Sequence, residues 1–245
     1  MPQFKTLIVP ITSVFPITHD TKGYHLSVPA DYGYKAGQFV TVEIGIPQAD
    51  GALKKAKRSY SIASSPTPHP DLLELCIKLT PGGIFTPWFL QYIKAGDEVT
   101  IQGPFGTFML YDHDKPSAVH LISAGSGVAP VMGLLRDLTA RKLEVPIRWI
   151  SSNKTPADIC YREEIHRIAA ANPNVSIFET ITRPDGTEWG GHTGRLTVDT
   201  LREWCVDIST SLFFICGPPE FVDAVIAELR ALGIEAKQIR KEKYD

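Results

Sequence analysis

Apolar and polar residues follow different patterns in the two halves of the chain, and the change falls near residues 112–116. In the first half, short stretches rich in β-branched and aromatic residues stand between clusters of turn-forming residues, a spacing typical of antiparallel strands. The expected strands cover residues 4–9, 39–44, 72–79 and 98–102, and the expected turns cover residues 20–23, 36–38, 95–97 and 103–104. One helical stretch, residues 85–93, interrupts them. The first half is therefore predicted to form an antiparallel β-barrel or sandwich.

The second half alternates apolar strands with helices. Strands are expected at residues 118–123, 146–150, 175–180, 212–216 and 236–241, and helices at residues 131–141, 158–171, 198–204 and 220–232. This alternation predicts a doubly wound α/β fold with a parallel five-stranded sheet. We therefore expect two domains, residues 1–112 and residues 116–245.

Composition excludes several classes of protein. Of the 245 residues, 43% are hydrophobic and 21% are charged, which is typical of a soluble globular chain. The formal net charge of −2 leaves no excess of basic residues for nucleic acid. No apolar run approaches the ~20 residues of a membrane helix. The N-terminus lacks a basic region followed by an apolar one, so no secretion signal is expected and the cytoplasm is the default compartment.

The cysteines and histidines show no metal-binding spacing. None of the four cysteines pairs as C-x-x-C, and none of the seven histidines pairs as H-x-x-x-H. We therefore expect no metal ion and no iron–sulfur cluster within the chain.

A glycine-containing loop joins the first strand and helix of the second half. Residues 123–130 contain Gly125, Gly127 and Pro130. Glycines there let the backbone turn tightly and approach a pyrophosphate, which the free N–H groups of the helix start would bind. Pro130 suits the first helical turn. The alternative is a tight loop without a ligand.

Cys216, Gly217 and Pro218 follow the fourth strand of the same half. Ligands of doubly wound sheets bind beyond the carboxyl ends of the strands, so Cys216 would face the same crevice as the glycine loop. A buried cysteine followed by a turn is the alternative, and from this motif alone it is the favoured one.

Two further motifs lie in the first half. Strand alternation places Arg58 and Tyr60 on one face and Ser61 on the other, unless a bend intervenes. Arg58 can pair with a phosphate and Tyr60 can stack on a planar ring, although a solvated strand gives the same pattern. Gly82 and Gly83 open the single helix and form a second candidate phosphate site, with Thr86 as a cap or a ligand.

The order of these motifs resembles the ferredoxin–NADP reductase superfamily of flavoprotein reductases. The motifs run R-x-Y-S-x-x-S, G-G-x-x-T, G-x-G-x-x-P and C-G-P-P, and the resemblance covers nearly the whole chain. It implies a Greek-key barrel that binds FAD, with FMN found in some relatives, followed by a nicotinamide-nucleotide domain. It also implies an NAD(P)H-dependent reductase that passes a hydride to flavin N5 and then electrons to an acceptor.

The resemblance assigns roles to particular residues. Ser61, Cys216 and Glu242 are the expected catalytic residues. The expected cofactor-binding residues are Arg58, Tyr60, Ser61, Lys78, Gly82, Gly83, Thr86, Gly125, Gly127, Pro130, Arg183, Cys216, Gly217, Pro218 and Tyr244. In one branch of the family a terminal aromatic residue stacks on the flavin. Here Asp245 follows Tyr244, so that match is imperfect and a frayed terminus is the alternative.

The nucleotide and the acceptor are less closely specified. Residues 152–158 resemble the corresponding loop of NADH-using cytochrome b5 reductases, which favours NADH, while Lys154 and Arg183 could still meet the 2′-phosphate of NADPH. Because the chain lacks the clustered cysteines of a fused [2Fe–2S] domain, the expected acceptor is a separate ferredoxin or oxygenase component, or another iron–sulfur, haem or small acceptor. Lys54, Lys55 and Lys57 would form a docking patch for an acidic partner or, more simply, a solvated loop.

Two rival interpretations remain at this point. One is a flavin-free dehydrogenase of the Rossmann type, against which residues 58–64 argue. The other is a non-catalytic chain that senses redox state or serves as a subunit of a larger electron-transfer complex.

Overall fold

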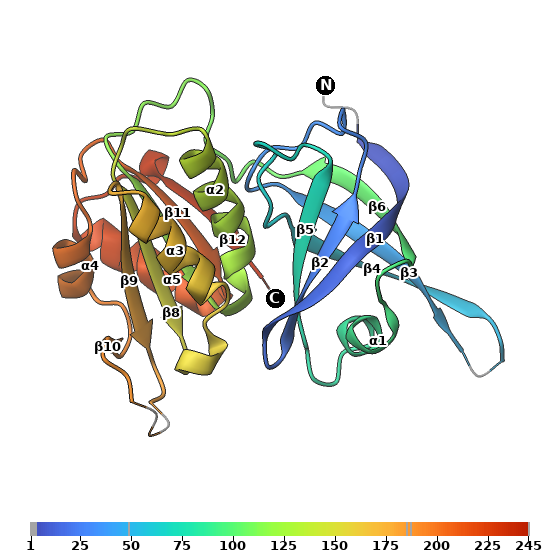
Figure 1. Cartoon of the computed structure of the whole chain (residues 1–245). Helices are drawn as coiled ribbons and strands as arrows, with labels where there is room; N and C mark the ends of the chain where they lie inside the picture. Colours follow the sequence, from blue (N-terminus) through green and yellow to red (C-terminus); the bar gives the residue numbers. More distant parts are fainter. Residues whose placement is uncertain (1–3, 49, 185, 187, 245) are drawn as a thin grey trace.

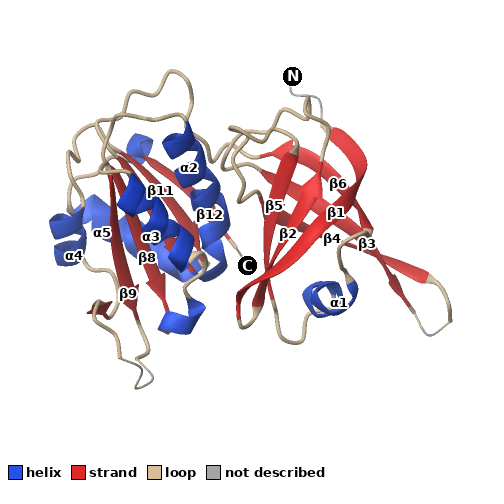
Figure 2. Ribbon diagram, viewed as in Figure 1, coloured by secondary structure: helices blue, strands red, loops and turns tan. Residues whose placement is uncertain are grey.

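Two six-stranded sheets, one in each half of the chain, form the framework of the protein (Figures 1 and 2). The computed structural model describes residues 4–48, 50–184, 186 and 188–244. The first sheet is antiparallel and has the strand order β4-β3-β6-β1-β2-β5. Its strands are β1 (Lys5–Thr18), β2 (Thr21–Ser27), β3 (Phe39–Pro47), β4 (Leu53–Ser61), β5 (Leu72–Lys78) and β6 (Glu98–Phe105). The antiparallel fold predicted for the first half is confirmed.

The first sheet curls into a barrel because its two outermost strands meet. Ile62, directly after β4, forms a bridge with Leu75 of β5. Helix α1 (Phe85–Tyr92) covers one end of the barrel and buries Phe85 and Phe89 there. Strands β3 and β4 continue beyond the barrel as a long hairpin (Figure 1).

The turn expected at residues 20–23 lies at residues 19–20 instead, because β2 already begins at Thr21. The hydroxyls of Thr18 and Thr21 both donate to the carboxylate of Asp20, at 2.9 Å each, and this closes a tighter turn. Gly23 belongs to β2 and leaves room for the Phe15 ring on β1, since a Cβ atom there would lie 2.3 Å from that ring.

The second sheet is parallel and has the strand order β10-β9-β8-β7-β11-β12. Its strands are β7 (Val119–Ala124), β8 (Ile147–Asn153), β9 (Val175–Ile181), β10 (His192–Thr193), β11 (Leu212–Gly217) and β12 (Ile239–Lys243). Its helices are α2 (Val128–Ala140), α3 (Arg162–Ala171), α4 (Val198–Trp204) and α5 (Pro219–Ala231). Thus the five expected strands are present, and the two-residue β10 adds a sixth at the edge.

Helices cover both faces of this sheet, as a doubly wound fold requires. Alternate residues of β11 enter two separate apolar clusters: Phe214 packs with α2 and α3, whereas Phe213 and Ile215 pack with α4 and α5. Figure 2 shows the sheet between these two pairs of helices. No helix of the described chain is long and apolar enough to span a membrane.

Unforeseen 3₁₀ turns precede three elements of the second half. They occupy Gly125–Gly127 before α2, Pro156–Asp158 before α3 and Ala236–Gln238 before β12. Residues expected to begin α3 and β12 belong to two of these turns, so α3 begins later, at Arg162, and β12 at Ile239, whereas α2 begins three residues earlier than predicted, at Val128.

Strand β5 takes part in both halves of the molecule. Its residues Leu73, Leu75 and Ile77 point into the barrel core. The alternate residues face the second half: Cys76 joins the apolar cluster of α2 and α3, and Glu74 and Lys78 make ion pairs there. The outer face of β5 is therefore the seam between the two halves.

Candidate functional site

Two grooves lie side by side along this seam, and both are lined by Lys78 and Ser126. The barrel groove has a volume of about 660 Å³ and is bounded by the end of β4, the turn after β5 and the start of α1. The sheet groove has a volume of about 620 Å³ and is bounded by the carboxyl ends of β7 and β8 and the start of α5. Molecules occupying the two grooves would therefore meet near the two shared residues.

The end of β4 forms one wall of the barrel groove. Arg58, Tyr60 and Ser61 all line it, together with Ser59. Alternation predicted two opposite faces, but residues of both faces line the groove where β4 ends, next to the Ile62–Leu75 bridge that closes the barrel. The half-buried ring of Tyr60 packs on Phe85, with ring centroids 5.8 Å apart.

Arg58 provides free positive charge at this wall. Its guanidinium is exposed and donates to the carbonyl of Lys57 at 2.8 Å, and no carboxylate of the described residues pairs with it. An exposed guanidinium without an ionic partner is suited to bind a phosphate.

The start of α1 forms the floor of the barrel groove. Gly83 and Thr86 line it, and Gly82 lies outside it. No side chain caps the helix, so its first N–H groups are left for a ligand. The hydroxyl of Thr86 accepts from the N–H of Thr80 at 2.9 Å, which makes this threonine a brace of the preceding turn.

The glycine loop of the second half has two different functions. Gly125 lines the sheet groove and has φ of +54°, a conformation that favours glycine. Gly127 and Pro130 lie behind the groove wall, both buried. A Cβ atom on Gly127 would lie 2.3 Å from the carbonyl oxygen of Cys216, so this glycine permits close contact with β11.

Residues from the two halves of the chain meet where the grooves join. The hydroxyl of Ser61 donates to Glu242 Oε2 at 3.2 Å, and the hydroxyl of Tyr244 donates to Ser61. The backbone N–H of Tyr244 donates to the carbonyl of Gly217 at 3.1 Å. Cys216 and Glu242 are paired in the parallel register of β11 and β12. Ser61, Cys216, Glu242 and Tyr244 thus form one cluster, the junction cluster.

Burial controls ionisation in the junction cluster. Burial raises the pKa of Glu242 to about 7, although the hydrogen bond from Ser61 opposes the shift. Burial, with the nearby Glu242, also raises the pKa of the fully buried Cys216 thiol well above its ordinary value. The cluster therefore holds a neutral thiol beside a carboxyl group able to exchange a proton near neutral pH.

The remaining predicted residues are divided between the grooves and the surface. Lys78 lines both grooves, and its ammonium lies 3.0 Å from Asp20 and 3.9 Å from Asp158. Pro218 lines the sheet groove, whereas Gly217 is buried beside it. Arg183 is exposed and lines neither groove.

One group of residues has the spacing of metal ligands, but the ammonium of Lys78 already balances the charge of its carboxylates. His19, Asp20 and Asp158 offer ligand atoms within 4.8 Å of one another. The Lys78 ammonium lies among the two carboxylates and holds the pKa of Asp20 below its ordinary value, against the effect of burial.

Sequence reasoning did not single out three residues of the grooves. Ser126 lines both grooves, and Arg195 and Thr197 line the sheet groove. Thr197 caps α4, so the signal available was a capping threonine at a helix start beyond a strand end. Arg195 lies two residues before that cap and carries no pattern of its own.

Comparison with known proteins covers both halves. Residues 9–110 match the family model of the oxidoreductase FAD-binding domain, and residues 121–226 match that of the oxidoreductase NAD-binding domain. The glycine betaine monooxygenase reductase subunit of Pseudomonas aeruginosa is 31% identical over 217 residues, covering 88% of this chain and 57% of that protein. The propane 2-monooxygenase reductase component of Mycolicibacterium smegmatis is 31% identical over 243 residues, covering 96% of this chain and 66% of that protein.

Solved structures agree with these matches. The cytochrome P450 reductase GcoB of Amycolatopsis superposes with a TM-score of 0.84 at 26% identity, covering 98% of this chain and 70% of that one. A ferredoxin NADP+ reductase from Neisseria gonorrhoeae with bound FAD and NADP shares the fold at a TM-score of 0.80 and 21% identity, with 98% of both chains covered. The chain spans a little over half the length of the first curated relatives that it matches.

Proposed function

The chain belongs to the ferredoxin–NADP reductase superfamily of flavoprotein reductases, and we propose that it transfers electrons from NAD(P)H through FAD to a separate acceptor protein. The observation that carries this proposal is the junction cluster, in which Ser61 from the barrel contacts Glu242 and Tyr244 from the second half. FAD, when bound, accepts a hydride at N5 and releases electrons to an acceptor. We assign FAD binding to residues 1–112 and nucleotide binding to residues 116–245.

The barrel groove fits a flavin nucleotide. It combines an exposed guanidinium on Arg58 that pairs with no carboxylate of the described residues, an aromatic ring on Tyr60 and, after Gly83, the start of α1 without a side-chain cap. These groups match a pyrophosphate, a planar ring and a phosphate. The sheet groove fits a second nucleotide, because Gly125 and Ser126 precede α2, and Lys154 and Arg195 add positive charge.

The protein's own groups position the reacting rings and handle the proton. Ser61 offers a hydroxyl at the wall of the barrel groove. Its Oγ atom lies 3.2 Å from Oε2 of Glu242, and the carboxyl group of Glu242 can supply a proton through this hydrogen bond. Tyr244 lines the barrel groove and covers the buried Cys216, so we propose that it moves aside when the nicotinamide ring enters. Holding two reactants in register makes their reaction effectively unimolecular, a contribution that can reach ~7–11 kcal/mol.

We propose NADH as the preferred nucleotide and an oxygenase component or a ferredoxin as the acceptor. The sequence of residues 152–158 supports NADH, and Arg183, one of the two candidate readers of a 2′-phosphate, lies outside the groove. The names of the relatives above support an oxygenase partner. Lys55 and Lys57 both pair with Glu43, at 2.9 and 2.8 Å, which supports a solvated hairpin over a free docking patch. The four cysteines are free thiols, which suits the reducing cytoplasm where we place the protein.

The decisive experiment is anaerobic reduction of the purified protein by NADH and by NADPH. We expect bound yellow flavin that NADH bleaches, with a higher kcat/KM for NADH. A colourless protein that oxidises an alcohol or hydroxy acid would support a flavin-free dehydrogenase instead. Yellow flavin that neither nucleotide bleaches would support a non-catalytic subunit.

Substitution of Ser61 tests the junction cluster itself. Ser61→Ala should retain FAD and slow flavin reduction by roughly 10–100-fold, because the hydroxyl beside the reacting ring is lost. Ser117→Ala is the matched control, since its hydroxyl donates to the backbone carbonyl of Asp207 at 2.9 Å and the residue lines neither groove. Equal reduction rates for Ser61→Ala and Ser117→Ala would remove Ser61 from the catalytic residues.

A further inference from the structure

Helix α2 lies directly against the barrel segment that follows Ser61. A Cβ atom on Gly133 would lie 2.7 Å from the carbonyl oxygen of Ile62 and 3.1 Å from that of Ser64. Both are backbone atoms, which cannot turn away as a flexible side chain can. Only glycine allows α2 and residues 62–64 to approach this closely.

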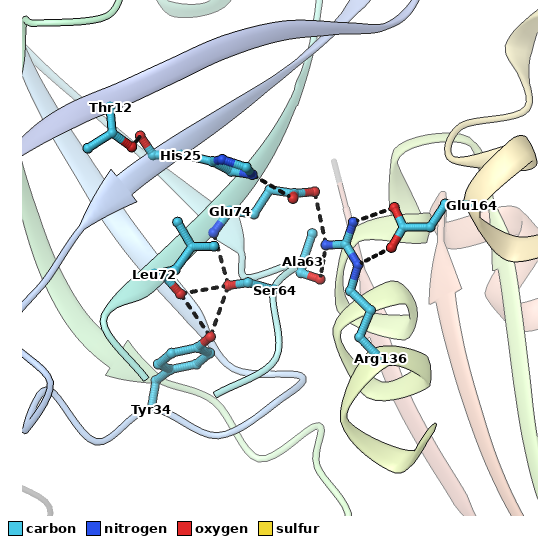
Figure 3. A network of polar contacts seen from close by, with 9 residues as sticks. All are labelled: Thr12, His25, Tyr34, Ala63, Ser64, Leu72, Glu74, Arg136 and Glu164. Carbon is cyan, nitrogen blue, oxygen red and sulfur yellow. Dashed lines mark hydrogen bonds and ion pairs between the residues drawn. The ribbon is translucent and has the colours of Figure 1, made fainter. Parts of the chain in front are cut away.

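Arg136 fastens the same contact one turn further along α2. Its guanidinium donates to the carbonyl of Ala63 at 2.8 Å and to both carboxylate oxygens of Glu164 on α3, at 2.8 and 2.7 Å (Figure 3). It also lies 3.1 Å from Glu74 on β5 and 5.2 Å from the centre of the Tyr161 ring. One side chain of the second half thus holds two elements of the barrel.

Hydrogen bonds to β5 hold residues 62–64, the barrel segment that Arg136 contacts. The N–H of Ala63 donates to the carbonyl of Glu74 at 2.8 Å, and the N–H of Glu74 donates to the hydroxyl of Ser64 at 3.0 Å. The carboxylate of Glu74 lies 3.0 Å from His25 Nε2 (Figure 3). Burial would raise the pKa of Glu74, but His25 and Arg136 hold it below its ordinary value. Residues 62–64 therefore have little freedom to shift relative to α2.

The contact between α2 and residues 62–64 connects the barrel groove with the sheet groove. Ser61 precedes the clamped segment by one residue and lines the barrel groove. Gly125 and Ser126 precede α2 and line the sheet groove. Arg136 lies nine positions after Gly127, roughly 13 Å along α2 at the usual rise of a helix. A rigid connection therefore runs from the nucleotide loop, along α2, to the residue beside the flavin groove.

We propose that Arg136 is a positioning residue for hydride transfer, which with Gly133 fixes the flavin-side wall at Ser61 relative to the nucleotide loop. Its side chain lines neither groove and acts through the carbonyl of Ala63. The proposal rests on the function proposed above. A displacement of 1 Å away from the chemistry can lower a rate by about 100-fold, so the loss of this clamp should be seen in the rate more than in nucleotide affinity.

The test separates the rate of hydride transfer from nucleotide affinity in single-turnover stopped-flow experiments on the FAD-loaded protein. Arg136→Met should slow hydride transfer by roughly 10–100-fold and change the Kd for NADH less than about threefold. Arg136→Lys keeps the charge but loses the planar guanidinium. Its rate of hydride transfer should lie between those of the wild type and Arg136→Met. Glu164→Gln keeps the donor to Ala63 and should change the rate less than threefold. Arg202→Ala is the control, because Arg202 pairs with Asp199 of its own helix, α4, at 2.7 Å and lines neither groove.

Gly133→Ala tests the same idea without removing a charge. Its Cβ atom should push residues 62–64 away and slow hydride transfer in the same direction as Arg136→Met. Hydrogen exchange of the backbone amides of residues 62–65 gives a readout that does not depend on activity. It should become faster in Arg136→Met and Gly133→Ala, with and without bound FAD, and stay unchanged in Arg202→Ala.

The outcomes that overturn the proposal are distinct from those that overturn the function. A wild-type flavin that NADH and NADPH cannot reduce would refute the proposed function and this inference with it. A reducible wild type, with Arg136→Met and Gly133→Ala that only melt at lower temperature and transfer hydride at the wild-type rate, would refute the positioning role alone. An equal loss of rate and NADH affinity would also refute it, because Arg136 would then act on binding.

Discussion

The two glycine-led helix starts, at α1 and at α2, show the same sequence pattern and different construction. At α1, a Cβ atom on Gly82 would meet no atom within 4 Å, whereas one on Gly83 would lie 3.1 Å from the carbonyl oxygen of Thr80 in the preceding turn. At α2, Gly127 is buried and backbone atoms of Cys216 and Gly217 lie 2.3–2.6 Å from where its Cβ would be. Each start thus has one glycine in open space, Gly82 or Gly125, and one closely packed glycine, Gly83 or Gly127. The starts differ in what the packed glycine meets: its own turn at α1, and the backbone of β11 at a shorter distance at α2.

This comparison explains why glycine spacing alone cannot assign a function to each glycine. Gly82 is needed for its φ of +75°, and Gly127 has an ordinary φ of −62° that alanine could adopt. The barrel-side start relies on the side-chain charge of Arg58, whereas the second start relies on exact backbone packing between a loop and β11. Substitutions at the two starts should consequently differ in size and in kind.

Gly127→Ala should have the largest effect. The added methyl collides with a strand backbone that cannot yield, and overpacking of this kind costs about 3 kcal/mol. We expect that loss in the free energy of unfolding, measured by urea denaturation, together with NADH affinity at least roughly tenfold weaker. Stability and NADH affinity equal to wild type would show that the α2 start is as open as that of α1.

Glu242→Gln, in the junction cluster between the two grooves, should alter the pH dependence of the free energy of unfolding. The pKa of Glu242 is raised from 4.5 to about 7, so the folded protein holds this proton more tightly than the unfolded chain. Its contribution to stability is complete below about pH 4.5 and is lost as the pH rises to about 7, up to about 3 kcal/mol. Glutamine removes this contribution, and denaturation at pH 5 and pH 8 should show a smaller difference than in wild type. The same difference in both proteins would contradict the raised pKa.

Arg58→Ala tests the open start. Loss of a charge-assisted hydrogen bond to phosphate should weaken FAD binding by about 1.5–3 kcal/mol, roughly 10–100-fold, with little change in the stability of the FAD-free protein. Lys57→Ala is the control, because Lys57 pairs with Glu43 at 2.8 Å. Equal FAD affinities of the two variants in equilibrium dialysis would exclude Arg58 as the phosphate ligand.

Gly82→Ala should have the smallest effect and completes the comparison with Gly127→Ala. Space is available, so only the left-handed backbone is strained, at a cost of about 1–2 kcal/mol. NADH affinity should not change. If Gly82→Ala lowers the free energy of unfolding as much as Gly127→Ala does, the turn before α1 is packed more tightly than its open surroundings indicate.

Local patterns were sufficient for most of the fold. Strand and helix periodicity is set by neighbouring residues, so the alternation in the second half predicted its sheet and its helices directly. The strand β2 was obscured because Asp20, Thr21 and Gly23 are all common in turns. Only the contact between Gly23 and Phe15 on the neighbouring strand shows why glycine belongs there.

The candidate site depends on contacts between distant residues, which no local pattern contains. Ser61 and Tyr244 are 183 positions apart, and their proximity was suggested by the family resemblance alone. Gly133 and Arg136 were not singled out at all. A glycine and an arginine within a helix are unremarkable until the barrel segment packed against them is known.

Strand β5 has one further consequence, for the cooperativity of unfolding. Since Leu73 and Ile77 belong to the barrel core and Cys76 to the core of the second half, a slip of β5 by one residue would reverse both assignments at once. Neither half can release this strand without exposing apolar surface of the other. The two halves are therefore thermodynamically coupled and should denature in a single transition.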